Sequence, residues 1–264
     1  MTQQPRLISA TIITYQEADN IADCIRSVQS VCDDIVVVDS YSDDQTCSIA
    51  TQMGARVFLQ KYLGDGPQRN IAGQYAHHDW LLSIDADERL EQDAIDFLRT
   101  VQLHRTDIAY AFRRRNLVGD HWLRASGFYP NVRTRLYNKQ HTRFNDEKKH
   151  TRLLKRGHVV TTKVHIRHLT YRNYQHWMAR IGEMSTRDAR IIFEQGRRVK
   201  KYTPAVHAFW SFLRQFIFLG GIFHGNDGLT IAFTTMIRTY MKYLICYEMQ
   251  KREQQKSSSH KNTQ

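Results

Sequence analysis

The sequence has few cysteines, and none of them forms a recognisable motif. The four, Cys24, Cys32, Cys47 and Cys246, include no CxxC pair and no His/Cys cluster at zinc-ligand spacing. Scattered cysteines in a chain of this size fit a reducing compartment and structural roles. We therefore expect them to be buried.

The sequence also lacks a long apolar run and a recognisable secretory signal. The nearest candidate for a membrane span, Phe216 to Ile237, is interrupted by His224, Asn226 and Asp227, so it falls short of the roughly 18 apolar residues that a spanning helix needs. The segment Met1 to Arg6 is polar and runs directly into a strand-like segment. These absences predict a cytoplasmic protein that at most attaches to a membrane surface.

Acidic residues are scarce in the second part of the chain. Residues 1–104 hold 16 of the 26 Asp and Glu but 7 of the 38 Lys and Arg, which leaves a net charge of −9 there and +21 in the remainder. The basic part should therefore meet a phosphorylated substrate, an anionic membrane face or nucleic acid. Nucleic acid is disfavoured, because it leaves the acidic part unexplained and the aromatic residues are not interleaved with Lys and Arg as in a stacking groove.

Apolar, β-branched segments alternate with helical patterns in the first hundred residues. The alternation predicts an α/β fold with a single doubly wound, mostly parallel sheet. We expect buried strands at 7–14, 35–38, 56–59 and 80–84, and helices after Asn20 and over 42–53 and 91–101. Asn20 and the run 42–44 are the expected helix caps.

The pattern becomes looser after residue 105 and then turns helical. Strand-like stretches at 108–113 and 133–137 precede a helical stretch over 174–195 and two amphipathic patterns that begin at Pro204 and after Gly228. We therefore expect a catalytic domain over 1–170, a helical region over 171–250 and a disordered, Lys/Ser/Gln-rich tail over 251–264. The wide apolar stripe of the helical region fits core packing or an interfacial helix on anionic lipid.

Carboxylates follow three of the predicted strands. Glu17 lies just past the first strand, Asp39 ends the second, and Asp85 and Asp87 follow the fourth. Ligands of open parallel sheets bind beyond the carboxyl ends of the strands, and clustered acids require a cation or hydrogen-bond donors. A hard divalent ion that bridges Asp87 to a diphosphate meets this need. The alternative is that Asp85 to Glu88 only cap the following helix.

A glycine-containing loop, Gly64 to Asn70, enters a further helix. Arg69 within it offers a planar donor fork that suits phosphate. The alternative for a lone arginine in the first turn of a helix is simple solvation.

Together these segments resemble the inverting family 2 glycosyltransferases, and most closely the lipopolysaccharide core β-glucosyltransferase group of Gram-negative bacteria. The resemblance rests on ISATIITYQEADNI, DDIVVVDSYSDDQT, GPQRN, DWLLSIDADERL, SGFYPNVRTRLY and LGGIFHGNDGL, which occur in the order of the family. It implies a Rossmann-like fold of the glycosyltransferase A type with a C-terminal helical appendage. It also implies a glycolipid acceptor, such as lipopolysaccharide inner core, at the cytoplasmic surface of the inner membrane.

The resemblance implies roles for individual residues and direct displacement at the anomeric carbon. Asp39 would contact the base, Asp85 would face the ribose and the metal, and Asp87 would bind the metal, Mg²⁺ or Mn²⁺. The residues implied for the nucleotide sugar, for which UDP-glucose is expected, are Thr14, Glu17, Asp39, Arg69 and Asp85.

The sequence departs from its relatives at the catalytic base. A His-Glu pair follows the RLY-like strand in the group, whereas this chain has His150-Thr151, and threonine cannot act as a base near neutral pH. Asp146 and then Glu147 are the expected substitutes, although both also fit a solvated turn. His224 is a second departure, because relatives have Asp there. A non-catalytic protein that binds a glycan or nucleotide is therefore the alternative function.

Two histidines, one directly before the IRHLTY segment and one within it, offer one more candidate site. A metal site that includes His165 and His168 is conceivable, but surface or core histidines are the commoner outcome.

Overall fold

The computed structural model describes residues 7–146, 153–155 and 157–261, and the chain divides into two compact units. The first unit comprises the chain up to Arg115 together with Pro130–Leu169. The second comprises Asn116–Tyr129 and the chain from Thr170 onward. Strands β6 (Ile108–Val118) and β11 (His158–Tyr171) contribute residues to both units.

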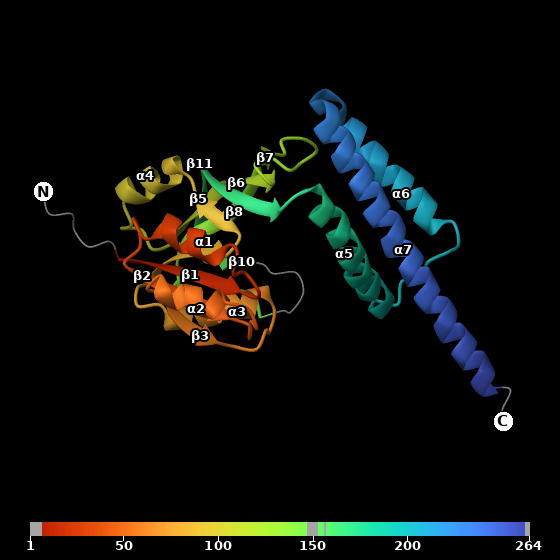
Figure 1. Ribbon diagram of the computed structural model, residues 1–264, viewed down its shortest axis with the longest axis horizontal. Coiled ribbons are helices and arrows are strands. Elements are labelled where there is room, and N and C mark those ends of the chain that lie inside the picture. The colour runs from red at the N-terminus through yellow and green to blue at the C-terminus, as the bar shows by residue number, and fades with distance from the viewer. Residues whose placement is uncertain (1–6, 147–152, 156, 262–264) are drawn as a thin grey trace, which may run out of the picture. The chain divides into compact units, whose positions relative to one another are not determined.

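Most of the described strands belong to one 9-stranded sheet. Its strand order is β3-β2-β1-β4-β8-β6-β11-β5, and β7 pairs with β6. The strands β3, β2, β1 and β4 are parallel, whereas β8, β6 and β5 join through antiparallel pairs. The α/β class is therefore confirmed (Figure 1). The remaining strands of this region are β1 (Ile8–Thr14), β2 (Asp34–Asp39), β3 (Arg56–Leu59), β4 (Trp80–Asp85), β5 (Glu88–Leu90), β7 (His121–Trp122), β8 (Asn131–Asn138), and the separate pair β9 (Thr142–Phe144) and β10 (Leu153–Lys155).

Helices cover both faces of the parallel part of the sheet. Because successive side chains of a strand point to opposite faces, Ile35 and Val37 of β2 join one core cluster while Val36 and Val38 join the other. The first cluster includes residues of α1 (Ile21–Val28), α2 (Thr46–Gln52) and α4 (Gln92–Thr100), and the second includes Ala72 of α3 (Asp65–Tyr75). The parallel strands β1, β2 and β4 end at the same edge with the polar residues Thr14, Asp39 and Asp85.

The N-termini of α1 and α2 are not capped as the sequence predicts. Asn20 precedes α1, but its side chain donates to a Glu17 carboxylate oxygen at 2.7 Å and does not cap the helix. In the second loop, the Asp44 carboxylate accepts the Thr46 backbone N–H at 3.0 Å. Both loops thus use their polar side chains to order the segment that follows a strand. Cys24, Cys32 and Cys246 are buried, as expected, whereas Cys47 is only partly buried, contrary to the expectation.

The second unit is built around the helices α5 (Tyr174–Glu194), α6 (Thr203–Leu213) and α7 (Gly225–Lys261), with a π-helical turn, η1 (Arg214–Phe218), and a 3₁₀ turn, η2 (Gly221–His224), between the last two. Figure 1 shows α7 running beside α5 and α6. The backbone of α7 packs tightly on η2, because a Cβ atom on Gly228 would lie 1.8 Å from the Gly221 carbonyl oxygen. Glycine is therefore required at this bend.

The structure describes the tail, which the sequence predicts to be disordered, only as far as Lys261. Helix α7 continues to Lys261, because Lys, Gln, Glu and Arg are good helix formers. An ion pair one helical turn apart, Arg252 with Glu248 at 2.5 Å, supports it.

Among the described residues, no single helix combines the length and hydropathy of a membrane span. Thr203–Phe218 and Gly221–Gln255 meet that criterion only when taken together, and they are bent by 65°.

Candidate functional site

The carboxylate that ends β2 is buried and fully oriented by its neighbours. Asp39 has no exposed surface. One of its oxygens accepts the Thr14 hydroxyl at 2.7 Å and the Ser42 hydroxyl at 2.6 Å, and the other accepts the Ser42 backbone N–H at 2.7 Å. Thr14 and Asp39, which were predicted to share a pocket, are thus in direct contact across adjacent parallel strands.

The loops that follow β1 and β2 contain strained backbone. Gln16 has a φ of 56° and Tyr41 a φ of 62°, which is the left-handed region that non-glycine residues rarely adopt. The Gln16 backbone N–H donates to the Ser42 hydroxyl at 2.7 Å, and the Glu17 backbone N–H donates to the Thr46 hydroxyl at 2.8 Å. The two loops therefore hold each other, and strain of this kind clusters at ligand sites.

The carboxylate that ends β4 lies in a network of arginines. Arg69 forms an ion pair with one Asp85 oxygen, and Arg135 binds the other at 2.7 Å. Arg135 also binds Glu88 at 2.5 Å. Glu88 is completely buried, and its other oxygen accepts the Asp85 backbone N–H at 3.0 Å. Guanidinium groups thus supply the compensation that clustered acids require.

This network controls the ionisation of Asp85. Burial alone would raise its pKa, but Arg135 and Arg69 hold the pKa of this carboxyl well below its usual range. A carboxyl whose folded pKa lies below its unfolded value, near 3.9, contributes stability above that pH. The contribution is lost as the pH falls from that value toward the folded pKa, so it is present throughout the neutral range.

A β-bulge places Arg135 in this network. Leu136 pairs with Tyr110 and Thr134 pairs with Ala111, so Arg135 is the extra residue between two consecutive partners on β6. Bulges redirect side chains next to active sites. The RTRLY segment is part of the family resemblance, but the sequence alone does not predict a role for its arginines. The only sequence feature that could have indicated such a role is the spacing of Arg133 and Arg135, two residues apart near the end of a strand.

The segment predicted as a loop, Gly64 to Asn70, is helical from Asp65 onward, so Arg69 lies in α3, and this helix also positions β9. The Asn70 side chain donates to the Phe144 carbonyl and accepts its backbone N–H, each at 2.9 Å. Gly66 permits this approach, because a Cβ atom there would lie 2.5 Å from the Asn145 carbonyl oxygen. Arg69 itself is buried, so the alternative of a solvated arginine is wrong.

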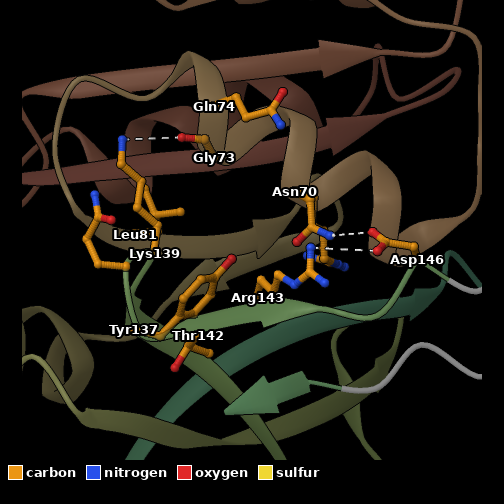
Figure 2. A pocket seen from close by; sticks show the side chains of 11 residues that line it. Asn70, Gly73, Gln74, Leu81, Tyr137, Lys139, Thr142, Arg143 and Asp146 are labelled. Atoms are coloured by element: carbon orange, nitrogen blue, oxygen red, sulfur yellow. Dashed lines mark hydrogen bonds and ion pairs between the residues drawn. The ribbon is translucent and has the colours of Figure 1, made fainter. Parts of the chain in front are cut away.

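A cavity of about 460 Å³ lies beside α3 and is lined by Arg69, Lys139, Arg143 and Asp146 among others. Asn70 and Arg143 face Asp146 in this cavity, at 3.4 and 3.7 Å (Figure 2). A second cavity, of about 550 Å³, is lined by Arg69 and Asp85. Arg69 therefore borders both cavities. Glu147, His150 and Thr151 lie outside the described residues.

Asp87 has a different partner from Asp85. Its Oδ2 lies 3.2 Å from Nε2 of His168, because His168 pairs with Glu88 in the antiparallel ladder between β11 and β5. A carboxylate and an imidazole that converge in this way are suitable ligands for a divalent ion. Asp85 to Glu88 do not cap α4, whose N-cap is Glu91.

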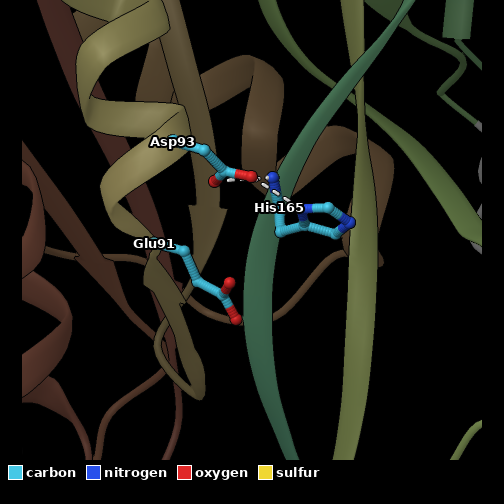
Figure 3. A group of neighbouring side chains, drawn as sticks. All are labelled: Glu91, Asp93 and His165. Carbon is cyan, nitrogen blue, oxygen red and sulfur yellow. Dashed lines mark hydrogen bonds and ion pairs between the residues drawn. The ribbon is translucent and has the colours of Figure 1, made fainter.

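A second group of potential metal ligands comprises Glu91, Asp93 and His165 (Figure 3). His165 Nδ1 lies 2.6 Å from an Asp93 oxygen. Glu91 is already neutralised by Arg115 at 2.5 Å. Ion pairing explains this group without a metal, and His165 and His168 therefore have separate acidic partners.

Replacing Glu88 by Gln tests the network. The substitution leaves Arg135 with excess buried charge, and loss of one partner of a buried ion pair costs roughly 3–5 kcal/mol. We expect the midpoint of urea unfolding, followed by circular dichroism, to fall accordingly. Asp107→Asn, which removes an exposed carboxylate from a pair with Arg105, should leave the midpoint unchanged. Equal midpoints for the two variants would contradict the assignment.

Comparison of the sequence with known proteins assigns the chain to a family. The model of "Glycosyl transferase family 2" matches residues 9–162. An uncharacterized glycosyltransferase from Rickettsia prowazekii (strain Madrid E) is 30% identical over 251 residues, which covers 88% of this chain and 85% of that protein. The lipopolysaccharide core biosynthesis glycosyltransferase LpsC from Rhizobium meliloti (strain 1021) is 26% identical over 266 residues, with 91% and 95% covered.

Solved structures show more distant similarity. TarS 1-349 from S. aureus has a TM-score of 0.45 at 15% identity and covers 88% of this chain and 90% of that one. Glucosyl-3-phosphoglycerate synthase from Mycobacterium tuberculosis, in complex with Mn²⁺, UDP and glucosyl-3-phosphoglycerate, has a TM-score of 0.32 at 23% identity and covers 42% and 44%. Because the family model spans more than half of the 264 residues and the R. prowazekii protein aligns over most of both chains, the protein is a glycosyltransferase that belongs to glycosyl transferase family 2.

Proposed function

We propose that the protein transfers a hexose, with glucose the first choice, from a nucleotide sugar to a glycolipid such as lipopolysaccharide inner core. The single observation that carries this proposal is the row of oriented carboxylates Asp39, Asp85 and Asp87 at one edge of the sheet. The name of the R. meliloti relative, a lipopolysaccharide core biosynthesis glycosyltransferase, supports the class of acceptor.

The nucleoside would bind beside β1 and β2. Asp39 is fixed by Thr14 and Ser42. Because Asp39 has no exposed surface, the segment that carries Ser42 would have to move for Asp39 to accept a hydrogen bond from a base. Tyr15 and Tyr41, which are 56% and 60% exposed, follow the same two strands and offer aromatic surface. Glu17 lies in the ordered loop beyond β1 and would line the nucleotide pocket.

A divalent ion, Mg²⁺ or Mn²⁺, would be held by Asp87 with His168. These two side chains are 28% and 13% exposed and converge at 3.2 Å. Asp85 has both oxygens engaged by Arg69 and Arg135, so its role is to position the ribose side of the site. When bound, the ion neutralises charge on the departing diphosphate.

Transfer also requires a group that accepts the proton of the attacking hydroxyl. Asp146 is the first candidate, because Asn70 and Arg143 orient it in a cavity that Arg69 borders. Glu147 is the second candidate. The chain would hold the acceptor hydroxyl in line with the bond that breaks, which lowers the entropic part of the barrier.

The helical unit would attach to the cytoplasmic surface of the inner membrane. Between residues 195 and 247 the sequence holds seven Lys and Arg but one acid, Asp227, which pairs with His121 at 2.8 Å. Phe218 and Phe223 at the bend are 67% and 87% exposed. Exposed aromatic residues beside cations suit an anionic lipid interface.

The metal assignment is tested by binding of UDP in the presence of Mn²⁺, measured by calorimetry on the full chain. Asp87→Ala and His168→Ala should each weaken Mn²⁺-dependent binding about tenfold or more, and Asp87→Ala should abolish transfer. His165→Ala removes a histidine that pairs with Asp93 and should bind as wild type. Unchanged binding by Asp87→Ala would overturn the assignment. A tight donor complex without transfer to any deacylated core acceptor would favour the non-catalytic alternative.

The base is tested by Asp146→Asn. We expect kcat to fall about 100-fold or more, which is the usual contribution of a general base, with donor affinity unchanged. Asp96→Asn, on an exposed turn of α4, should retain wild-type kcat. If Asp146→Asn also retains it and Glu147→Gln loses it, the base is Glu147.

Membrane attachment is tested by sedimentation with vesicles that contain phosphatidylglycerol. Phe223→Asp should reduce the partition coefficient for the vesicles about tenfold or more, since burying one phenylalanine contributes roughly 1.5–3 kcal/mol. Leu59→Asp, at a residue of the first unit that is 56% exposed, serves as control. Equal binding by both variants would exclude the bend as the attachment surface.

A further inference from the structure

The second cavity is richer in arginine than the donor carboxylates require. Arg69, Arg114, Arg133 and Arg135 all line it, together with Asp65 and Asp85. Glu88, buried beneath the cavity, pairs with Arg135 and Arg114 and adds a third negative charge. Four guanidinium groups therefore face three carboxylates, and the cavity has an excess of positive charge.

The excess resides on Arg133 and Arg114. Arg133 forms no ion pair with any of the described residues, and its Nη1 donates only weakly to the Val132 carbonyl, at 3.3 Å. Arg114 reaches Glu88 at 3.3 Å, which Arg135 already binds more closely, and the buried Nε of Arg114 has no partner within the described part of the chain. Arg133 as a whole is exposed, but desolvation of its guanidinium, with Arg114 and Arg135 nearby, lowers its pKa.

These two arginines lie on strands beyond those of the proposed nucleotide site, although Arg69 and Asp85 of that site line the same cavity. Asp39 ends β2 and Asp87 follows β4, whereas Arg133 lies on β8 and Arg114 on β6. The order β2-β1-β4-β8-β6 puts four strand spacings of about 4.8 Å between β2 and β6. With the nucleoside near β2 and the diphosphate near β4, groups on β6 and β8 face the side where the acceptor must approach.

We propose that Arg133, assisted by Arg114, binds an anionic group of the acceptor, either a phosphate or a carboxylate on the sugar that receives the hexose. This inference rests on the proposed function, because the assignment of donor and acceptor sides depends on it. Planar guanidinium forks bind both anions in bidentate fashion. The arginines lie in a cavity, so the anion would be partly withdrawn from water and would orient the accepting hydroxyl.

The test uses inorganic phosphate and acetate as probes of the full chain. Thermal unfolding is followed with and without each anion at constant ionic strength, both in the absence and in the presence of saturating UDP and Mn²⁺. A ligand that binds the folded state raises the unfolding temperature with its concentration. We expect phosphate, acetate or both to raise it also when UDP is bound, and the stronger effect identifies the preferred anion.

The control variants distinguish this site from general basic surface. Arg133→Gln should weaken anion binding about tenfold, since hydrogen bonds to charged groups contribute roughly 1.5–3 kcal/mol. Arg26→Gln, which removes an exposed arginine of α1, should leave it unchanged. Equal loss in both variants, or anion stabilisation that disappears once UDP is bound, would overturn the proposal. Absence of any effect of UDP itself would instead count against the proposed donor site.

Discussion

The buried ion pairs of Arg135 with Asp85 and Glu88 are the constraint on which the site depends. Burying a charge is costly unless it is paired and hydrogen-bonded, and Glu88 has no exposed surface. Arg135 can meet two carboxylates only because the β-bulge of β8 redirects it. The pairs join β4, β5 and β8 at the point where the parallel and antiparallel parts of the sheet meet.

This constraint divides the acids of the DADE segment by function. Asp85 and Glu88 are neutralised by arginines and fix the end of β4. Asp87, between them in sequence, is directed to His168 on β11. A segment that looks uniformly acidic therefore contains two carboxylates that are paired with arginines and one that is paired with an imidazole. The proposed metal site depends on this separation.

The proposed sites would also account for the uneven distribution of charge along the chain. The acidic first part supplies Asp39, Asp85 and Asp87, and the basic part that follows supplies Arg114, Arg133 and Arg135 to the same sheet. Much of the remaining positive charge belongs to the helical unit, where it accompanies exposed apolar side chains such as Phe223. Two different kinds of anion, a substrate group and a lipid surface, would thus account for one compositional feature.

The sequence by itself determined the parallel strands and the acids at their ends. Both can be read from short segments, because a run of β-branched residues marks each strand and the acid that could bind a ligand follows directly at its carboxyl end. The strands at 56–59 and 80–84 and the contact of Thr14 with Asp39 agree with that reasoning. Only the tertiary structure decided that Arg135 neutralises Asp85 and that His168 meets Asp87. Those contacts arise from a bulge and from the register of β11 with β5, and the pairing of strands that lie far apart in sequence leaves no periodic pattern in either strand.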